Sequence, residues 1–265
     1  MFRLPETTSN TLLAAACVTV GIPVTTHRKI HEGLGEERKT FTLGDKSLLS
    51  GREIFTQTLL KSHNCGDLEK LDPCNVFLDA LRGVKNRGFL VKWLTEGKTA
   101  HLTLHPDKRC PRTLYEAGAP SSPPLAVGNA GAPELFRTPH IAVAAALSTL
   151  GVPVVKIEDG AGRMRLFVLP RYGFAMHSAK QLDAKATVED FTSGKMAAQT
   201  PDHPFLYAHS AVRNYKALTD YMRDELPVIY FEDAKGSGRA AVIRSDAKTV
   251  AFDRAQKFFD RRLIS

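Results

Sequence analysis

Two cation–asparagine pairs, Lys85–Asn86 and Arg213–Asn214, are the residues of this sequence best suited to binding chemistry. A lysine or arginine beside an asparagine on an exposed helix face can contact a phosphate and a base edge or sugar. Further cations flank both pairs, and a predicted hairpin adds two arginines. The candidate nucleic-acid-binding residues are therefore Arg82, Lys85, Asn86, Lys92, Arg213, Asn214, Lys216, Arg223, Arg163 and Arg165. The alternative is that the asparagines cap or brace a neighbouring loop while the cations are merely solvated.

Metal binding and catalysis have less support in the sequence. His63, Cys65 and Cys74 lie close together, but their spacing lacks the paired cysteines that are typical of zinc sites. Glu53 and Glu189 are the one carboxylate pair that recurs between the two halves. The chain contains no GxSxG, HExxH, Walker or GxGxxG pattern. We therefore predict no catalytic residue, no metal and no cofactor.

An internal duplication indicates how the candidate residues are positioned. Residues 8–24, TSNTLLAAACVTVGIPV, return at 138–154 as TPHIAVAAALSTLGVPV. A second echo relates DPCNVFLDALRGVKNRGFLVKWL, from Asp72, to TPDHPFLYAHSAVRNYKALTDYM, from Thr200. Each cation–asparagine pair occupies the same place in this second segment. The sequence therefore predicts one module written twice.

Local signals define the elements of each module. Thr8 or Ser9, and Thr138 in the second copy, are the predicted N-caps of alanine-rich helices, which end at Gly21 and Gly151. Hairpins are predicted next, then two helices, a further strand pair and a last helix. The predicted segments are strands at 24–30, 39–43, 154–157, 164–169, 101–104, 228–231 and 240–243, and helices at 51–62, 187–198 and 252–263, besides the two echoed helices.

We therefore expect an α+β protein, with small antiparallel sheets covered by helices. Its predicted architecture is two tandem copies of a helix–hairpin–helix–helix–hairpin–helix module that form a pseudo-two-fold pair through their alanine-rich helices. The first module spans residues 1–116 and the second 136–265. Residues 117–135, rich in Pro, Gly and Ala, form the predicted linker.

The composition of the chain limits the classes of partner and the cellular location that we expect. The net charge of +8 and the pI of about 9.3 favour polyanionic ligands. No apolar run reaches the roughly 18 residues needed to span a membrane. Four cysteines are too few for a disulfide framework in 265 residues. We expect a cytoplasmic protein with reduced thiols.

The order of elements resembles that of LAGLIDADG homing endonucleases, which also join two modules through helices rich in small residues. The resemblance implies DNA binding. That family places an acidic residue at the end of the interface helix to hold the catalytic metal. Here the corresponding segments read VTVGIP and STLGVP, without a carboxylate, so the resemblance implies binding without cleavage. The module also resembles short domains encoded by bacterial mobile elements and phages.

The function predicted from the sequence is non-enzymatic nucleic-acid binding through a basic face shared by both modules. DNA and RNA are not distinguished. The alternative is a protein–protein interaction or assembly scaffold, in which the duplication creates a pseudo-dimer with a protein partner. A metal-dependent, nuclease-like enzyme is the least favoured class.

Overall fold

The computed structural model describes residues 7–30, 37–44, 51–97, 134–175, 180–224, 226–232 and 239–245. The described chain has a mixed α+β fold, as expected. It divides into two compact units, Met1–Asp72 with Arg213–Ser265 (unit 1) and Pro73–Val212 (unit 2). Each unit combines segments from both predicted modules, so the units and the sequence modules are different divisions of the chain.

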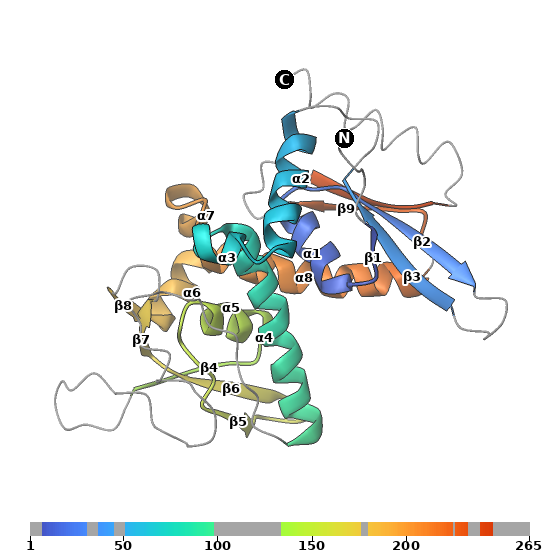
Figure 1. Cartoon of the computed structure of the whole chain (residues 1–265). Helices are drawn as coiled ribbons and strands as arrows, with labels where there is room; N and C mark the ends of the chain where they lie inside the picture. Colours follow the sequence, from blue (N-terminus) through green and yellow to red (C-terminus); the bar gives the residue numbers. More distant parts are fainter. Residues whose placement is uncertain are drawn as a thin grey trace. The chain divides into compact units, whose positions relative to one another are not determined.

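Unit 1 is built on a five-stranded sheet with the order β1-β3-β2-β10-β9. All neighbouring strands are antiparallel except β2 and β10, which are parallel. Helix α1 lies against this sheet (Figure 1). The elements of this unit are β1 (Thr7–Thr8), α1 (Thr11–Thr19), β2 (Val24–Ile30), β3 (Glu37–Leu43), α2 (Gly51–Asn64), α3 (Leu68–Leu71), β9 (Val228–Glu232) and β10 (Arg239–Arg244).

Unit 2 contains a three-stranded sheet with the order β4-β6-β5 and a separate hairpin, β7–β8. Helix α5 contacts β4 and β6, and the long helix α4 packs on α5. The elements of this unit are α4 (Val76–Glu96), β4 (Leu135–Thr138), α5 (Ile141–Thr149), β5 (Lys156–Asp159), β6 (Arg165–Pro170), β7 (Tyr172–Ala175), β8 (Lys180–Asp183), α6 (Ala184–Thr192) and α7 (Lys195–Gln199). Helix α8 (Pro204–Asp224) begins in unit 2 and ends in unit 1.

The alanine-rich helices start later than their sequence indicates. Their N-caps are Asn10 and His140, not the predicted Thr8 or Ser9 and Thr138. Strands β1 and β4 hold both threonines in extended backbone, so the helices cannot begin there. Each threonine hydroxyl instead accepts a hydrogen bond from the N–H two residues later, at 3.1 Å in both cases. The threonines therefore stabilise the turns that lead into the helices.

Both helices end as predicted. Gly21 and Gly151 have φ angles of 86° and 100°, a left-handed conformation that glycine adopts without strain. In α1 the N–H of Ile22 donates to the carbonyl of Cys17 at 2.8 Å, and the corresponding bond in α5 is 3.0 Å. With a second bond from each glycine N–H, these contacts form Schellman motifs. The chain is thereby turned back toward the hairpin that follows.

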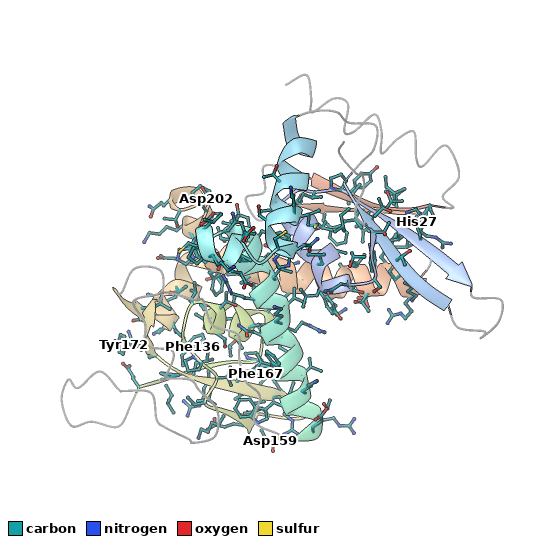
Figure 2. All side chains as sticks on the ribbon, in the orientation of Figure 1. His27, Phe136, Asp159, Phe167, Tyr172 and Asp202 are labelled. Carbon is teal, nitrogen blue, oxygen red and sulfur yellow. The ribbon has the colours of Figure 1, made fainter. Side chains whose placement is uncertain are left out.

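The two hairpins share a register. Phe41 on β3 pairs with Thr8 of β1 and with a threonine of β2. Phe167 on β6 pairs with Thr138 of β4 and with Ile157 of β5 (Figure 2). Both phenylalanines are buried. In each sheet a phenylalanine on the central hairpin strand thus forms the core against the alanine-rich helix.

Helices α4 and α8 are each 21 residues long. Phe77 and Leu81 of α4 lie in the core of unit 2, as does Phe205 at the start of α8. Gly83 permits a close crossing, because a Cβ atom there would lie 2.6 Å from the carbonyl oxygen of Ala208. Any larger residue at position 83 would force the two helices apart.

Other predicted elements differ in detail. The helix expected at 187–198 is two short helices, α6 and α7, because Gly194 adopts a φ of 76° between them. Strands β1, β4, β7 and β8 and helix α3 were not predicted. The strand expected at 101–104, residues 117–133 of the predicted linker and the helix expected at 252–263 lie outside the described residues. The linker was predicted to reach residue 135, but strand β4 already begins at Leu135. None of the described helices has both the length and the apolarity that crossing a bilayer requires.

Candidate nucleic-acid interface

Both asparagines of the cation–asparagine pairs act inside the fold. The Asn86 side chain is fully buried, and its Nδ2 donates to Thr149 Oγ1 at 3.1 Å within unit 2. Within unit 1, Asn214 Nδ2 donates to Thr19 Oγ1, also at 3.1 Å. Each threonine hydroxyl passes a hydrogen bond on to a carbonyl one turn earlier in its own alanine-rich helix. The asparagines therefore brace a neighbouring helix, and we no longer place them among the ligand-binding residues.

These anchors fix the orientation of the adjacent cations. Because Asn86 points into the core, rotation of α4 about its axis is restricted and Lys85 faces solvent. Asn214 constrains α8 in the same way, and Arg213 is exposed. Lys85, Lys92 and Arg213 form no ion pair with any described residue. Their charges are therefore available to a ligand.

Arg82 does not belong to this exposed set. Its side chain is only 5% exposed and its guanidinium lies 3.4 Å from Asp79, which is completely buried. The same nitrogen donates to the carbonyl of Pro73 at 3.2 Å. Arg82 therefore compensates a buried carboxylate beside the α4–α8 crossing and cannot contact a phosphate.

The outer face of α4 carries Lys85, Gly88 and Lys92, at positions i, i+3 and i+7. All three are exposed. The two lysines lie about 10.5 Å apart along the helix axis, given a rise of about 1.5 Å per residue. Two positive charges at this distance, neither of them in an ion pair with a described acid, can contact phosphates of one strand.

On the corresponding face of α8, the cations form ion pairs with acids of the same helix. Lys216 Nζ lies 2.6 Å from Asp220, and Arg223 contacts Asp220 at 3.5 Å and Asp224 at 3.0 Å. The hydrogen bond from Lys216 lowers the pKa of Asp220, and the bond to Asp224 raises that of Arg223. Of the predicted α8 cations, only Arg213 is exposed without an ion-pair partner in the described chain.

The β5–β6 hairpin is also largely self-compensated. Arg165 forms an ion pair with Asp159, at the end of the hairpin (Figure 2). On the same sheet Glu158 accepts from Lys156 and Arg137, and these bonds lower its pKa. Arg163, in the turn, is exposed and has no ion-pair partner among the described residues. The hairpin therefore offers one available cation.

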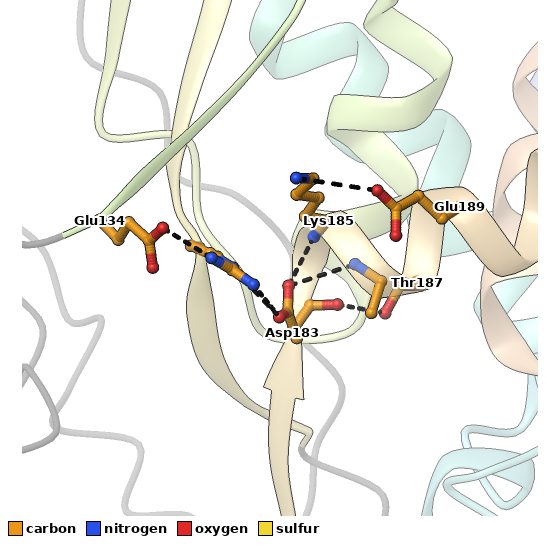
Figure 3. Close-up of polar contacts among 7 residues, drawn as sticks. Glu134, Asp183, Lys185, Thr187 and Glu189 are labelled. Atoms are coloured by element: carbon orange, nitrogen blue, oxygen red, sulfur yellow. Dashed lines mark hydrogen bonds and ion pairs between the residues drawn. The ribbon is translucent and has the colours of Figure 1, made fainter.

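An ion-pair network that the sequence did not indicate centres on Arg171. Its guanidinium donates to Glu134 at 2.6 Å and to Asp183 at 3.0 and 3.1 Å (Figure 3). Asp183 is also the N-cap of α6 and accepts from the N–H groups of Lys185 and Ala186. Burial raises the pKa of Asp183, but the hydrogen bonds from Arg171 and from the two backbone N–H groups outweigh burial and leave this pKa below its usual value. The network joins three segments of unit 2, and we assign it a structural role.

The weaker candidates gain no support. Within the described ranges, no group of three or more His, Cys, Asp or Glu side chains could hold a metal ion. Cys65 and Cys74 are exposed and form no disulfide within the described chain, and the side chain of Glu53 lies outside the described residues. His203, at the entry to α8, accepts a hydrogen bond at Nδ1 from the N–H of Phe205, so it serves as a cap.

Comparisons with known protein families, with curated proteins and with solved structures found no match.

Proposed function

We propose that the protein binds nucleic acid without catalysing a reaction, and that the outer face of α4 makes the main contacts. The observation that carries this proposal is the pair of exposed lysines, Lys85 and Lys92, to which no described acid is bonded. Of the other exposed cations that the structure describes, most form ion pairs, as Lys156 with Glu158 and Lys195 with Asp190 illustrate, although Lys39 and Lys61 form none with a described residue. An uncompensated basic stripe on a rigid helix suits a polyanion.

The expected binding is electrostatic and indifferent to base sequence. Lysine ammonium groups contact phosphates as point charges and release condensed counterions. The asparagines, which could have contacted base edges, are occupied within the fold. Arg213 and Arg163 are expected to add single phosphate contacts in unit 1 and unit 2 respectively.

We further propose that the two sequence modules are tandem copies of one ancestral module. Support comes from the matched Schellman motifs, the matched hairpin registers and the equal lengths of α4 and α8. The two asparagine–threonine bonds of 3.1 Å add to it. The pseudo-two-fold pairing of the modules stays a prediction.

Fluorescence anisotropy with labelled DNA and RNA, duplex and single-stranded, tests the binding proposal over a range of salt concentrations. We expect the protein to bind at about 50 mM salt, and the logarithm of its association constant to fall linearly with the logarithm of the salt concentration. The double variant K85Q/K92Q should bind at least about tenfold more weakly, with a salt slope reduced by roughly two.

A matched control is K185Q/K195Q, which removes two exposed lysines that are paired with Glu189 and Asp190. It changes the net charge equally but should weaken binding less than about twofold. Equal losses in the two double variants would show that only bulk charge matters, and no binding of the wild-type protein to any probe would refute the proposal. Binding of a protein in place of nucleic acid would favour the scaffold alternative.

A further inference from the structure

Gly88 is unusual among the glycines that the structure describes, because nothing in the described fold requires it. It lies in the interior of α4 with ordinary helical backbone, whereas Gly97 ends the helix with a φ of 64°. A Cβ atom at Gly88 would meet no atom within 4 Å, in contrast to Gly83, where it would clash with the backbone of Ala208. Neither its backbone conformation nor packing against the described residues explains this glycine.

A glycine in the middle of an exposed helix is unfavourable, because alanine forms helix far better and restricts the unfolded chain more. A feature that lowers stability without an internal reason suggests a requirement outside the fold. A glycine lets another backbone approach a helix more closely than any other residue does. The position of Gly88 between Lys85 and Lys92 indicates the charge of what approaches.

We infer that a sugar–phosphate strand crosses α4 directly over Gly88, with one phosphate bound by Lys85 and another by Lys92. The missing side chain lets the strand lie against the helix backbone, so that both ammonium groups reach phosphate oxygens. Charge complementarity selects this occupant, because the face carries two uncompensated cations and no acid between them. The inference rests on the proposed function and adds the contact point and the backbone-directed mode of binding.

The corresponding position on α8 supports this assignment. In the alignment of the two long helices, Lys216 corresponds to Gly88, and Asp220 corresponds to Lys92. Lys216 and Asp220 pair with each other at 2.6 Å, so this face carries both a side chain at the central position and an acid. A strand is therefore expected to cross α4 and not the matching face of α8.

The test is a size series at position 88 in the full-length protein, with thermal melting and anisotropy measured on the same samples. Gly88→Ala should raise Tm by roughly 2–4 °C, because helix propensity improves. It should nevertheless weaken binding of a labelled duplex about threefold, and Gly88→Gln about tenfold or more, at unchanged net charge. Ala186→Gln, at an exposed position of α6, adds comparable bulk and should leave affinity unchanged.

The inference predicts that Gly88→Ala raises Tm and weakens nucleic-acid binding. A glycine with a purely structural role would not produce these opposite effects. If the wild-type protein binds nucleic acid and the Gly88 variants bind equally well, the crossing point is wrong while the proposed function stands. If affinity falls only in proportion to a lowered Tm, the glycine is structural and the inference is also overturned. If the wild-type protein binds no probe, the proposed function itself fails.

Discussion

Helices α4 and α8 have equal lengths and related sequences, yet they use their polar residues differently. Each is anchored by an asparagine that bonds to a threonine of an alanine-rich helix. Outside these anchors they diverge, since α4 exposes uncompensated lysines whereas Lys216 and Arg223 of α8 contact Asp220. The shared feature maintains the fold, and the divergent one is where we place the function. A residue that recurs in both helices thus indicates what each helix needs in order to pack.

The largest expected effect concerns the buried ion pair, which α4 has and α8 lacks. Arg82→Ala leaves the Asp79 carboxylate buried without its cation, and we expect it to lower the free energy of unfolding by about 3–5 kcal/mol. The position that corresponds on α8 is Ser210, where substitution by alanine should change stability by less than about 0.5 kcal/mol. Urea denaturation measures both. A loss below about 1 kcal/mol for Arg82→Ala would contradict a fully desolvated pair.

Next in size is the difference between the two asparagine anchors. Asn86→Ala removes a buried hydrogen bond and should cost about 1–3 kcal/mol. Asn214 is only half-buried, so water can replace its side chain, and Asn214→Ala should cost about 0.5–1 kcal/mol. Denaturation of the two variants under identical conditions decides the order. A larger loss at Asn214 would mean that unit 1 depends more on its anchor than burial indicates.

The caps of the two helices should respond differently to pH. Asn75 caps α4 and does not titrate, whereas His203 caps α8 through a neutral Nδ1. Burial lowers the pKa of His203, although Asp190 opposes this shift. The stability that the neutral His203 cap contributes is therefore complete above about pH 6.5, the pKa of histidine in the unfolded chain. It is lost as the pH falls from there toward the lower pKa of His203 in the folded protein.

His203→Asn replaces this cap with one that does not titrate. We expect the variant to lose up to about 1 kcal/mol less stability than the wild-type protein between pH 7 and pH 5, because its cap persists. Denaturant midpoints at several pH values measure the difference. Identical pH profiles for the two proteins would show that the cap does not titrate in this range.

The smallest expected effect comes from making α8 resemble α4. Asp220→Asn removes the acid that holds Lys216, so this lysine becomes available, whereas Arg223 keeps its ion pair with Asp224. Nucleic-acid affinity should rise about two- to fivefold at low salt, with a steeper salt dependence. Glu189→Gln, which releases one exposed lysine of α6, is the charge-matched control and should have less effect. An equal gain in both variants would mean that net charge, not the helix face, governs binding.

Much of the local structure was predictable from the sequence. The strand at Val24–Ile30 has the predicted ends, and both glycine-terminated helices stop where expected. Such features depend on interactions between near neighbours in the chain, which the residue types specify. The N-caps at Asn10 and His140 were not predicted. They lie two residues after the predicted threonine caps because strands β1 and β4 hold those threonines, and these strands form only by pairing with distant segments.

By itself, the sequence determined the longer helices, several of the strands, the recurrence of the asparagines and the excess of positive charge. The tertiary structure alone decided which charges remain available. It buried Arg82 against Asp79 and directed both asparagines to threonines of the alanine-rich helices. The physical reason is that solvation and pairing depend on neighbours that are remote in the chain. Asn86 is bonded to Thr149, and Asn214 to Thr19, and no local pattern specifies such partners.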